Sequence, residues 1–368
     1  MREWQKALLT VLVSVAVFLL ICEGVLRFLP VRSIFLRQTV DAAHPYVHYA
    51  PNQDFVFSDG SLLTNANRGH FNNYGFVNDQ DYDPADPRPL LAVIGDSYIE
   101  AAMVAFPETV EARLSDAAGL SRRVYSFAVS GAQLSDFLAY SEFAHDTFHA
   151  RAMVVNVVNR DFDESLLRYK QVPGFHYYAE RPDGSLTLTL LDFHASVWRP
   201  LLRHSALARY LLLNIGSTPI GYRLKYWFAG LFGLPPYGPF NGPPVEDTER
   251  IALSKRAVNQ VLSEFPIRSG LEPSHILFLV DGYRVFDPAG LAEAEKSYFG
   301  VIRTYFIAQA RARGFEVADL QDWFARRHAA DGAVFQFPDD GHWNANGHEE
   351  AAKAVLASRV WQDFNAQR

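Results

Sequence analysis

Five short apolar runs, separated by stretches with helical spacing, are the feature that most constrains the fold of this chain. They lie at residues 89–97, 122–131, 152–165, 274–284 and 315–324. A short continuous apolar run is typical of a strand buried on both faces, and its alternation with helices predicts a parallel sheet covered on both sides. The expected fold class is therefore α/β, as a three-layer α/β/α, flavodoxin-like domain with a mostly parallel five-stranded sheet.

An apolar stretch at residues 7–29 predicts a transmembrane anchor ahead of this domain. No charge stands between Lys6 and Glu23, and with the residues just beyond Glu23 the stretch reaches the roughly 20 residues that a helix needs to cross a bilayer. A cleaved signal peptide would need a small-residue cleavage site, and none follows the apolar stretch convincingly. A lipidated Cys22 would need a small residue before it, but Ile21 stands there. Arg2 and Lys6 place residues 1–6 in the cytoplasm and the rest of the chain outside it.

Two further segments flank or interrupt the predicted domain at 89–368. Residues 30–88 alternate aromatic residues with turn formers and form a lead-in of short strands and loops. An insertion at about 165–270 begins with a predicted hairpin around Pro182-Asp183-Gly184. Its middle is apolar and basic, and we expect it either to cap the active-site end or to touch the membrane surface. The residues that suit a membrane surface are Arg203, Arg209, Arg223 and Lys225 among Trp198, Trp227 and Phe228.

Composition and motifs exclude several classes of function. The net charge of −7 and the absence of a basic run argue against nucleic acid as a partner. The single cysteine, Cys22, allows no internal disulfide. His145 and His149 have the spacing of a metal pair but lack an obvious third ligand, and no phosphate-binding glycine motif follows a strand. We therefore expect neither a metal nor an organic cofactor.

The carboxyl ends of the predicted strands carry the residues that suggest chemistry, because ligands of parallel sheets bind at that edge. Ser97 stands between a strand and a helix, where the helix N-terminus favours developing negative charge. His342 is the candidate base, and an acid two or three residues before it, Asp340 or Asp339, can orient the imidazole. The arrangement predicts a nucleophilic serine.

Other strand ends supply candidate oxyanion donors. A glycine at the second strand end, Gly131, lets its N–H approach a substrate oxygen, and an amide such as Asn159 follows the third strand. Asp281 and Arg284 follow the fourth, either as a structural ion pair or as a substrate contact.

Four motifs together resemble the SGNH/GDSL hydrolase family, in that family's order along the chain. They are VIGDSYIEA, FAVSGAQLSDF, VVNVVNRDFDES and DDGHWNANGH. The resemblance implies Ser97 as nucleophile and first oxyanion donor, Gly131 as second donor, and His342 as base with Asp340, or alternatively Asp339. The third motif departs from the family's Gly-Asn-Asp, so the third oxyanion donor is Asn159 or, in a strict alignment, Arg160.

The resemblance also implies a function and a location. A membrane-anchored member of this kind is similar to bacterial envelope enzymes that remove or transfer O-acetyl groups on envelope or exported polysaccharides. We expect a single-pass protein of the bacterial inner membrane with a periplasmic or extracellular domain, and an acylated carbohydrate or other ester as substrate. The alternatives are a lipid or small-ester esterase and a catalytically weak carbohydrate-binding or assembly module. The sequence does not identify protein partners.

Overall fold

The computed structural model describes residues 2–218, 221, 223 and 247–366. These residues fall into two compact units, each built from segments that are distant in the sequence. Unit 1 contains the described residues of Met1–Leu36, Asp54–Gly69 and Ala195–Tyr237. Unit 2 contains those of Arg37–Gln53, His70–His194 and Gly238–Arg368.

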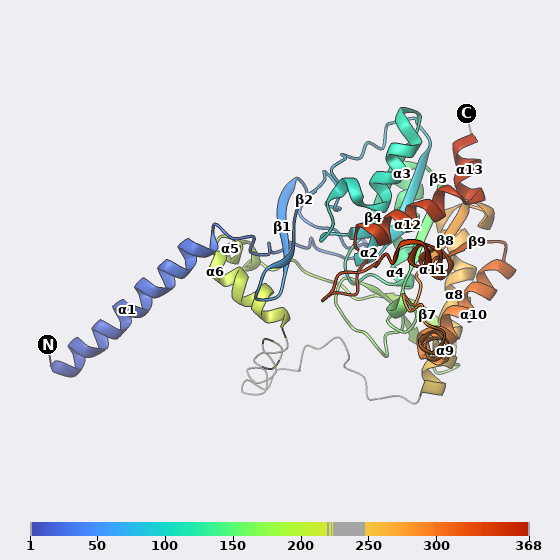
Figure 1. Ribbon diagram of the computed structural model, residues 1–368. Coiled ribbons are helices and arrows are strands. Elements are labelled where there is room, and N and C mark those ends of the chain that lie inside the picture. Colours follow the sequence, from blue (N-terminus) through green and yellow to red (C-terminus); the bar gives the residue numbers. More distant parts are fainter. Residues whose placement is uncertain (1, 219–220, 222, 224–246, 367–368) are drawn as a thin grey trace. The chain divides into compact units, whose positions relative to one another are not determined.

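Unit 2 is built on a five-stranded parallel sheet (Figure 1). Its strands lie in the order β4-β3-β5-β8-β9, and every neighbouring pair is parallel. Numbered along the chain within this sheet, the order is 2-1-3-4-5, that of the flavodoxin-like fold. The sequence-based prediction of the fold class is confirmed. The strands are β3 (Leu90–Gly95), β4 (Arg123–Ala128), β5 (Ala150–Val157), β8 (Ile276–Val280) and β9 (Glu316–Asp319).

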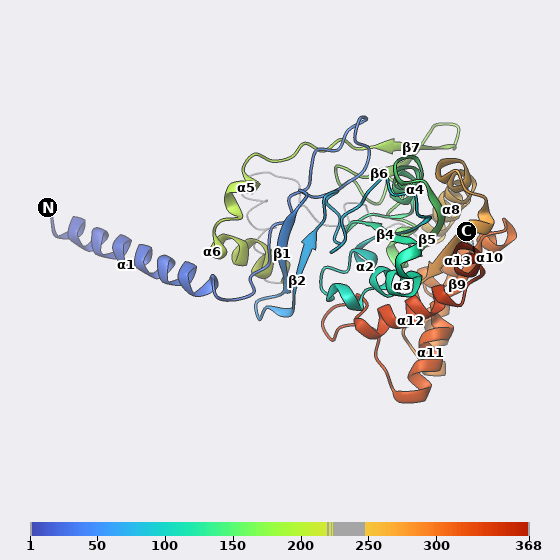
Figure 2. The ribbon, with the colours of Figure 1, turned by 90° about the horizontal axis from the view of Figure 1, so that it is seen from above.

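Helices cover both faces of this sheet (Figure 2). On one face, Leu91 and Val93 of β3 join a buried cluster with apolar side chains of α3 (Val110–Ala118), α11 (Leu320–Asp331), α12 (Ala345–Leu356) and α13 (Arg359–Ala366). On the other face, Phe278 packs against Phe265 and Phe306. The helices there include α4 (Leu134–Phe148), α8 (Asp247–Ser269) and α10 (Tyr298–Ala312), and α9 (Pro288–Lys296) precedes α10. Because both faces are covered, all of β3 and β8 is buried.

Parts of the lead-in belong to unit 2 and pack on its sheet. The Tyr82 ring stacks on Tyr125 of β4 with centroids 4.0 Å apart, and its hydroxyl donates to the Ser126 carbonyl at 2.6 Å. Beyond β5, the predicted hairpin is confirmed as antiparallel β6 (His176–Glu180) and β7 (Leu186–Leu190).

Unit 1 contains α1 (Glu3–Leu26), which overlaps the anchor predicted at residues 7–29. Among the described residues, α1 is the one helix long and apolar enough to cross a membrane, and none of its side chains is buried. The unit also holds most of the sheet formed by β1 (Gln53–Asp59) and β2 (Thr64–Phe71), together with α5 (Arg199–Leu202) and α6 (Ala206–Arg209). Lys225, Trp227 and Phe228 lie outside the described residues.

Candidate active site

Ser97 is held at a tight turn from β3 into the short helix α2 (Ser97–Glu100). The Asp96 side chain caps this helix by accepting the Tyr98 N–H at 2.9 Å. A Cβ on Gly95 would lie 2.5 Å from Cγ1 of Ile99, so the turn requires glycine there. The Gly-Asp-Ser sequence therefore presents the serine hydroxyl at the carboxyl end of a central strand.

Ser97, His342 and Asp340 form a continuous hydrogen-bonded series. His342 Nε2 lies 2.7 Å from Ser97 Oγ, and His342 Nδ1 lies 2.6 Å from Asp340 Oδ1. Asp340 Oδ1 also accepts the backbone N–H of His342 at 3.2 Å. Of the two candidate carboxylates it is thus Asp340 that the structure places against the imidazole. A carboxylate at Nδ1 keeps the proton on that nitrogen and leaves Nε2 to accept one from the serine.

Gly131 lies beside Ser97 in a cavity of about 550 Å³. Its φ of 89° is in the left-handed region, which favours glycine. Within the described part of the chain, the backbone N–H groups of Ser97 and Gly131 donate no hydrogen bond. Asn159 and Arg160 are exposed and border the same cavity from the turn η3 (Asn159–Asp161).

The loop that carries His342 is fixed through the carbonyl of Gly341. Tyr98 Oη donates to this oxygen at 2.9 Å, and the Arg284 guanidinium donates to it as well. Arg284 forms an ion pair of 3.0 Å with Asp281, and Asp281 accepts the indole N–H of Trp343 at 3.0 Å. Asp281 is buried, which raises the pKa of its carboxyl, and Arg284 also borders the cavity.

The loop that carries Gly131 is fixed by Glu100 from the last position of α2. The buried Glu100 carboxylate accepts the Ser130 N–H at 2.5 Å and the Ser130 hydroxyl at 2.6 Å. Tyr49, from the lead-in, donates to the same carboxylate at 3.0 Å. One side chain therefore joins the helix that begins with Ser97 to the turn that holds Gly131.

Several residues that line the cavity carry ionisable groups, among them Asp96, Asp161 and Lys170. Burial raises the pKa of Asp96 and of Asp161, and the neighbouring Asp96 carboxyl raises that of Asp161 further. Lys170 also borders the cavity, and its positive charge opposes the rise in the pKa of both carboxyls. Its Nζ donates to the Gly131 carbonyl at 2.6 Å and to Glu164 at 2.6 Å. Sequence reasoning missed Lys170, Glu100 and Tyr98. Tyr98 and Glu100 lie within three residues of Ser97, and this closeness is a usable signal. Lys170 lies in the insertion, where no sequence signal marks it.

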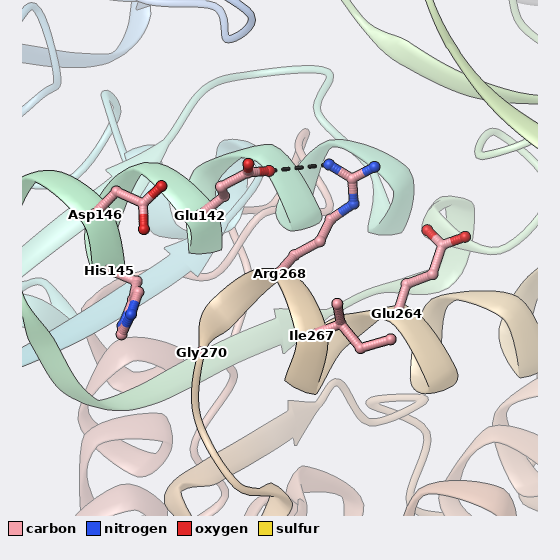
Figure 3. Close-up of a pocket in the computed structure, with 7 residues that line it drawn as sticks. All are labelled: Glu142, His145, Asp146, Glu264, Ile267, Arg268 and Gly270. Carbon is pink, nitrogen blue, oxygen red and sulfur yellow. Dashed lines mark hydrogen bonds and ion pairs between the residues drawn. The ribbon is translucent and has the colours of Figure 1, made fainter.

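A second hollow lies between α4 and the end of α8, away from these residues (Figure 3). Glu142 and His145 border it from α4, and Arg268 borders it from α8 and pairs with Glu142 at 2.9 Å. His149 ends α4 with a φ of 58° and does not border this hollow. Of the two histidines, only His145 is among the residues that border this hollow.

The fold and the site together define a class: an α/β protein with a serine–histidine–aspartate series at the carboxyl edge of a parallel sheet. No protein-family model matches the chain, and no curated protein matches its sequence.

The chain is similar in structure to several solved hydrolases. A lipase from a goat rumen metagenome is 11% identical over 74% of this chain and 99% of its own, with a TM-score of 0.39. A member of the lipolytic G-D-S-L family from Veillonella parvula is 9% identical over 74% of this chain and 98% of its own, with a TM-score of 0.35. An acetyl xylan esterase is 9% identical over 73% of this chain and 98% of its own, with a TM-score of 0.37.

Proposed function

We propose that this chain is an SGNH-type serine acyl-ester hydrolase or acyltransferase. The observation that carries the proposal is the series from Ser97 Oγ through His342 to Asp340, with contacts of 2.7 and 2.6 Å. A serine hydroxyl is a weak nucleophile until a base within hydrogen-bond reach can take its proton, and the base in turn needs a partner that orients it. Ser97 has a base within hydrogen-bond reach, and that base, His342, has Asp340 as the partner that orients it.

The chemistry proceeds in two steps. Ser97 Oγ attacks the ester carbonyl carbon while His342 Nε2 takes the hydroxyl proton, and the tetrahedral oxyanion accepts hydrogen bonds from the Ser97 and Gly131 N–H groups. The intermediate collapses to acyl-Ser97 as His342 gives its proton to the leaving alcohol. Water, or a sugar hydroxyl in a transferase, then attacks the acyl group with His342 again as base. The products are a carboxylic acid or a new ester, and free Ser97.

The cavity lining favours a short acyl group on a polar alcohol. Apart from glycines, the lining side chains without a polar group are Ala132 and Val158, whereas Arg160, Lys170 and Arg284 are among the charged ones. A long acyl chain needs apolar surface to bind, and a sugar needs hydrogen-bonding groups. We propose O-acetyl groups of an envelope or exported polysaccharide as the substrate. The membrane anchor at residues 7–29 would hold the enzyme in the inner membrane of a bacterium with the active site outside the cytoplasm.

Hydrolysis of chromogenic acyl esters of increasing chain length by the purified full-length protein tests this proposal. We expect turnover of the acetyl ester, a decline with longer chains, and loss of turnover in Ser97→Ala and His342→Ala. The exposed Ser263→Ala is the control for loss of a serine and keeps wild-type activity. Equal background rates for wild type and both active-site variants would exclude the hydrolase; a preference for long chains would favour the lipid esterase.

Transfer is distinguished from hydrolysis by offering an acetylated donor together with a glycan acceptor. Mass spectrometry of the products separates the two: an acetylated acceptor indicates a transferase, and free acetate alone indicates an esterase. A serine-directed phosphonate, located by peptide mapping, identifies the nucleophile independently, and labelling at a residue other than Ser97 would contradict its role.

A further inference from the structure

Glu23 is a charged residue inside the apolar helix α1, and the structure gives it partners from a distant segment. Its carboxylate accepts the Ser205 hydroxyl at 2.9 Å and the N–H groups of Ala206 and Leu207 at 3.1 and 2.8 Å. Arg27 adds an ion pair of 2.8 Å. Exposing a glutamate carboxylate to lipid costs free energy, whereas both carboxylate oxygens of Glu23 accept hydrogen bonds. Glu23 therefore caps the start of α6 and ties it to the last turns of α1.

The segment capped by Glu23 is a continuous helical stretch. It runs from α6 through η4 (Tyr210–Asn214) into η5 (Ile215–Ser217). Asn214 holds its far end by accepting the Arg32 N–H at 3.1 Å, and Arg209 donates to the Val31 carbonyl at 3.0 Å. Both ends of this stretch are thus attached to the chain within a few residues of the end of α1 (Figure 1).

Large apolar side chains are exposed around this attachment. Phe28, just beyond α1, is 92% exposed, and Trp198 and Leu201 are 70% and 62% exposed. Leu211 and Leu212 of η4 are exposed as well. Tryptophan and phenylalanine next to the end of an apolar helix are typical of the headgroup level of a bilayer, where a ring is half in contact with apolar chains.

The charge of the same segment is one-sided. Residues 195–218 contain Arg199, Arg203 and Arg209 and no aspartate or glutamate, in a chain whose net charge is −7. Basic residues among exposed apolar side chains fit the surface of a bilayer that contains anionic phospholipids.

We propose that residues 195–218 form a membrane platform, docked through Glu23 on the end of α1, that inserts Phe28, Trp198 and Leu201 into the headgroup layer of an anionic phospholipid bilayer. The platform rests on α1 spanning that bilayer, and it does not depend on the reaction proposed for Ser97. The proposal requires that α1 is retained in the protein, because Glu23 of α1 caps a helix of the folded unit.

Fluorescent probes on full-length protein in vesicles of phosphatidylglycerol and phosphatidylcholine test the platform. In a Cys22→Ala background, an environment-sensitive probe is attached to Leu201→Cys and, separately, to Phe28→Cys. Leu120→Cys is the matched control, a leucine 92% exposed in unit 2. We expect blue-shifted emission and quenching by spin-labelled lipid at positions 201 and 28, and water-like emission quenched by iodide at position 120.

Three outcomes would overturn the platform. If the probes at positions 201 and 28 behave like the control at position 120, the surface of the platform is exposed to water. Probes shielded from both iodide and spin-labelled lipid show a surface covered by protein. A membrane-extracted protein whose intact mass lacks α1 shows that the helix is cleaved.

Two variants separate the parts of the proposal. Glu23→Ala removes the cap while α1 stays apolar, so we expect the probe at 201 to lose its blue shift although the protein still resists carbonate extraction. Arg199→Glu with Arg203→Glu should reduce the shift in vesicles containing phosphatidylglycerol but not in phosphatidylcholine alone. An unchanged shift in Glu23→Ala contradicts docking through Glu23, and an unchanged shift in the arginine variant contradicts recognition of anionic lipid.

Discussion

At the scale of single residues, the two neighbouring aspartates before His342 differ in what they touch. Asp340 lies 2.6 Å from His342 Nδ1, whereas no contact of Asp339 with the imidazole is present in the described structure. Asp340→Asn turns an acceptor into an amide that can present its donor to the ring, which disfavours the productive tautomer. We expect kcat for an acetyl ester to fall by about 10³- to 10⁴-fold in Asp340→Asn. Asp339→Asn is the matched control, and a larger loss in Asp339→Asn than in Asp340→Asn would reverse the assignment.

Arg284 is a second single residue that acts on His342, as a positioning residue. It donates to the Gly341 carbonyl, between Asp340 and His342, and pairs with Asp281 at 3.0 Å. In Arg284→Gln the loop that carries His342 loses a charged donor, and a positive charge close to Asp340 is removed. We expect kcat to fall with little change in KM, and the acid limb of the kcat/KM profile to shift from its wild-type position.

Tyr98→Phe is the milder variant: it removes the other donor to the Gly341 carbonyl and the acceptor of one Arg284 N–H, but it leaves the Arg284–Asp281 ion pair intact. We expect kcat to fall about tenfold, since two hydrogen bonds of about 0.5–1.5 kcal/mol each are lost. An Arg284→Gln variant with raised KM and an unmoved pH profile would point instead to substrate contact.

At the scale of elements, Glu100 joins α2 to the turn after β4 through its two hydrogen bonds to Ser130. Glu100→Gln replaces one carboxylate oxygen by a nitrogen that cannot accept, so either the Ser130 N–H or its hydroxyl loses its acceptor. We expect the Gly131 donor to shift and kcat to fall about 10- to 100-fold, since a hydrogen bond to a charged group contributes about 1.5–3 kcal/mol. Tyr49→Phe keeps both Ser130 bonds and should lose less. Equal effects in the two variants would mean that Glu100 acts through the lead-in and not through the Gly131 turn.

The elements that could be predicted are those whose signal is local. β3 and β8 are buried at every position, so their apolar runs are continuous in the sequence. His348, which the sequence places beside His342, turns out to serve packing: burial lowers its pKa to about 3, and its Nδ1 accepts the Val110 N–H at 3.3 Å. That contact joins α12 to the start of α3 across a long sequence separation, and no local pattern encodes it.

In the candidate site, too, the residues that could be predicted are those with a local sequence signal. Ser97, Gly131 and His342 stand at strand ends or in a loop with a recognisable motif, and the structure brings them to one cavity. Lys170 reaches that cavity from a segment whose path depends on tertiary contacts, including the bond from Lys170 Nζ to the Gly131 carbonyl. The sequence predicted the anchor helix of unit 1 but not the joining of its distant segments, because these meet through long-range contacts such as Glu23 with Leu207.

At the scale of the whole molecule, a buried carboxyl makes stability depend on pH. Glu111 in α3 is fully buried, and burial raises its pKa from 4.5 to about 8. Below about pH 4.5 the folded and unfolded chains both hold this proton, and above about pH 8 both release it. Between these values the unfolded chain loses the proton first, so the free energy of unfolding falls by about 1.4 kcal/mol per pH unit.

Glu111→Gln removes that dependence, because glutamine has no proton to lose. We expect the variant to gain stability over wild type by about 3 kcal/mol more at pH 7 than at pH 5, measured by denaturant unfolding in detergent. The exposed Glu108→Gln is the control for loss of a carboxylate. A difference between Glu111→Gln and wild type that is the same at both pH values would contradict the prediction.

The contact between Ser97 and His342 joins residues 245 positions apart in the sequence, and the chain between them includes the Ala195–Tyr237 segment of unit 1. A nascent chain that has not yet been synthesised beyond residue 342 holds the serine without its base, and pairings this distant in sequence form late in folding. For the reaction proposed above, the nucleophile is therefore complete only after the loop that carries His342 has docked beside Ser97 at the carboxyl end of β3.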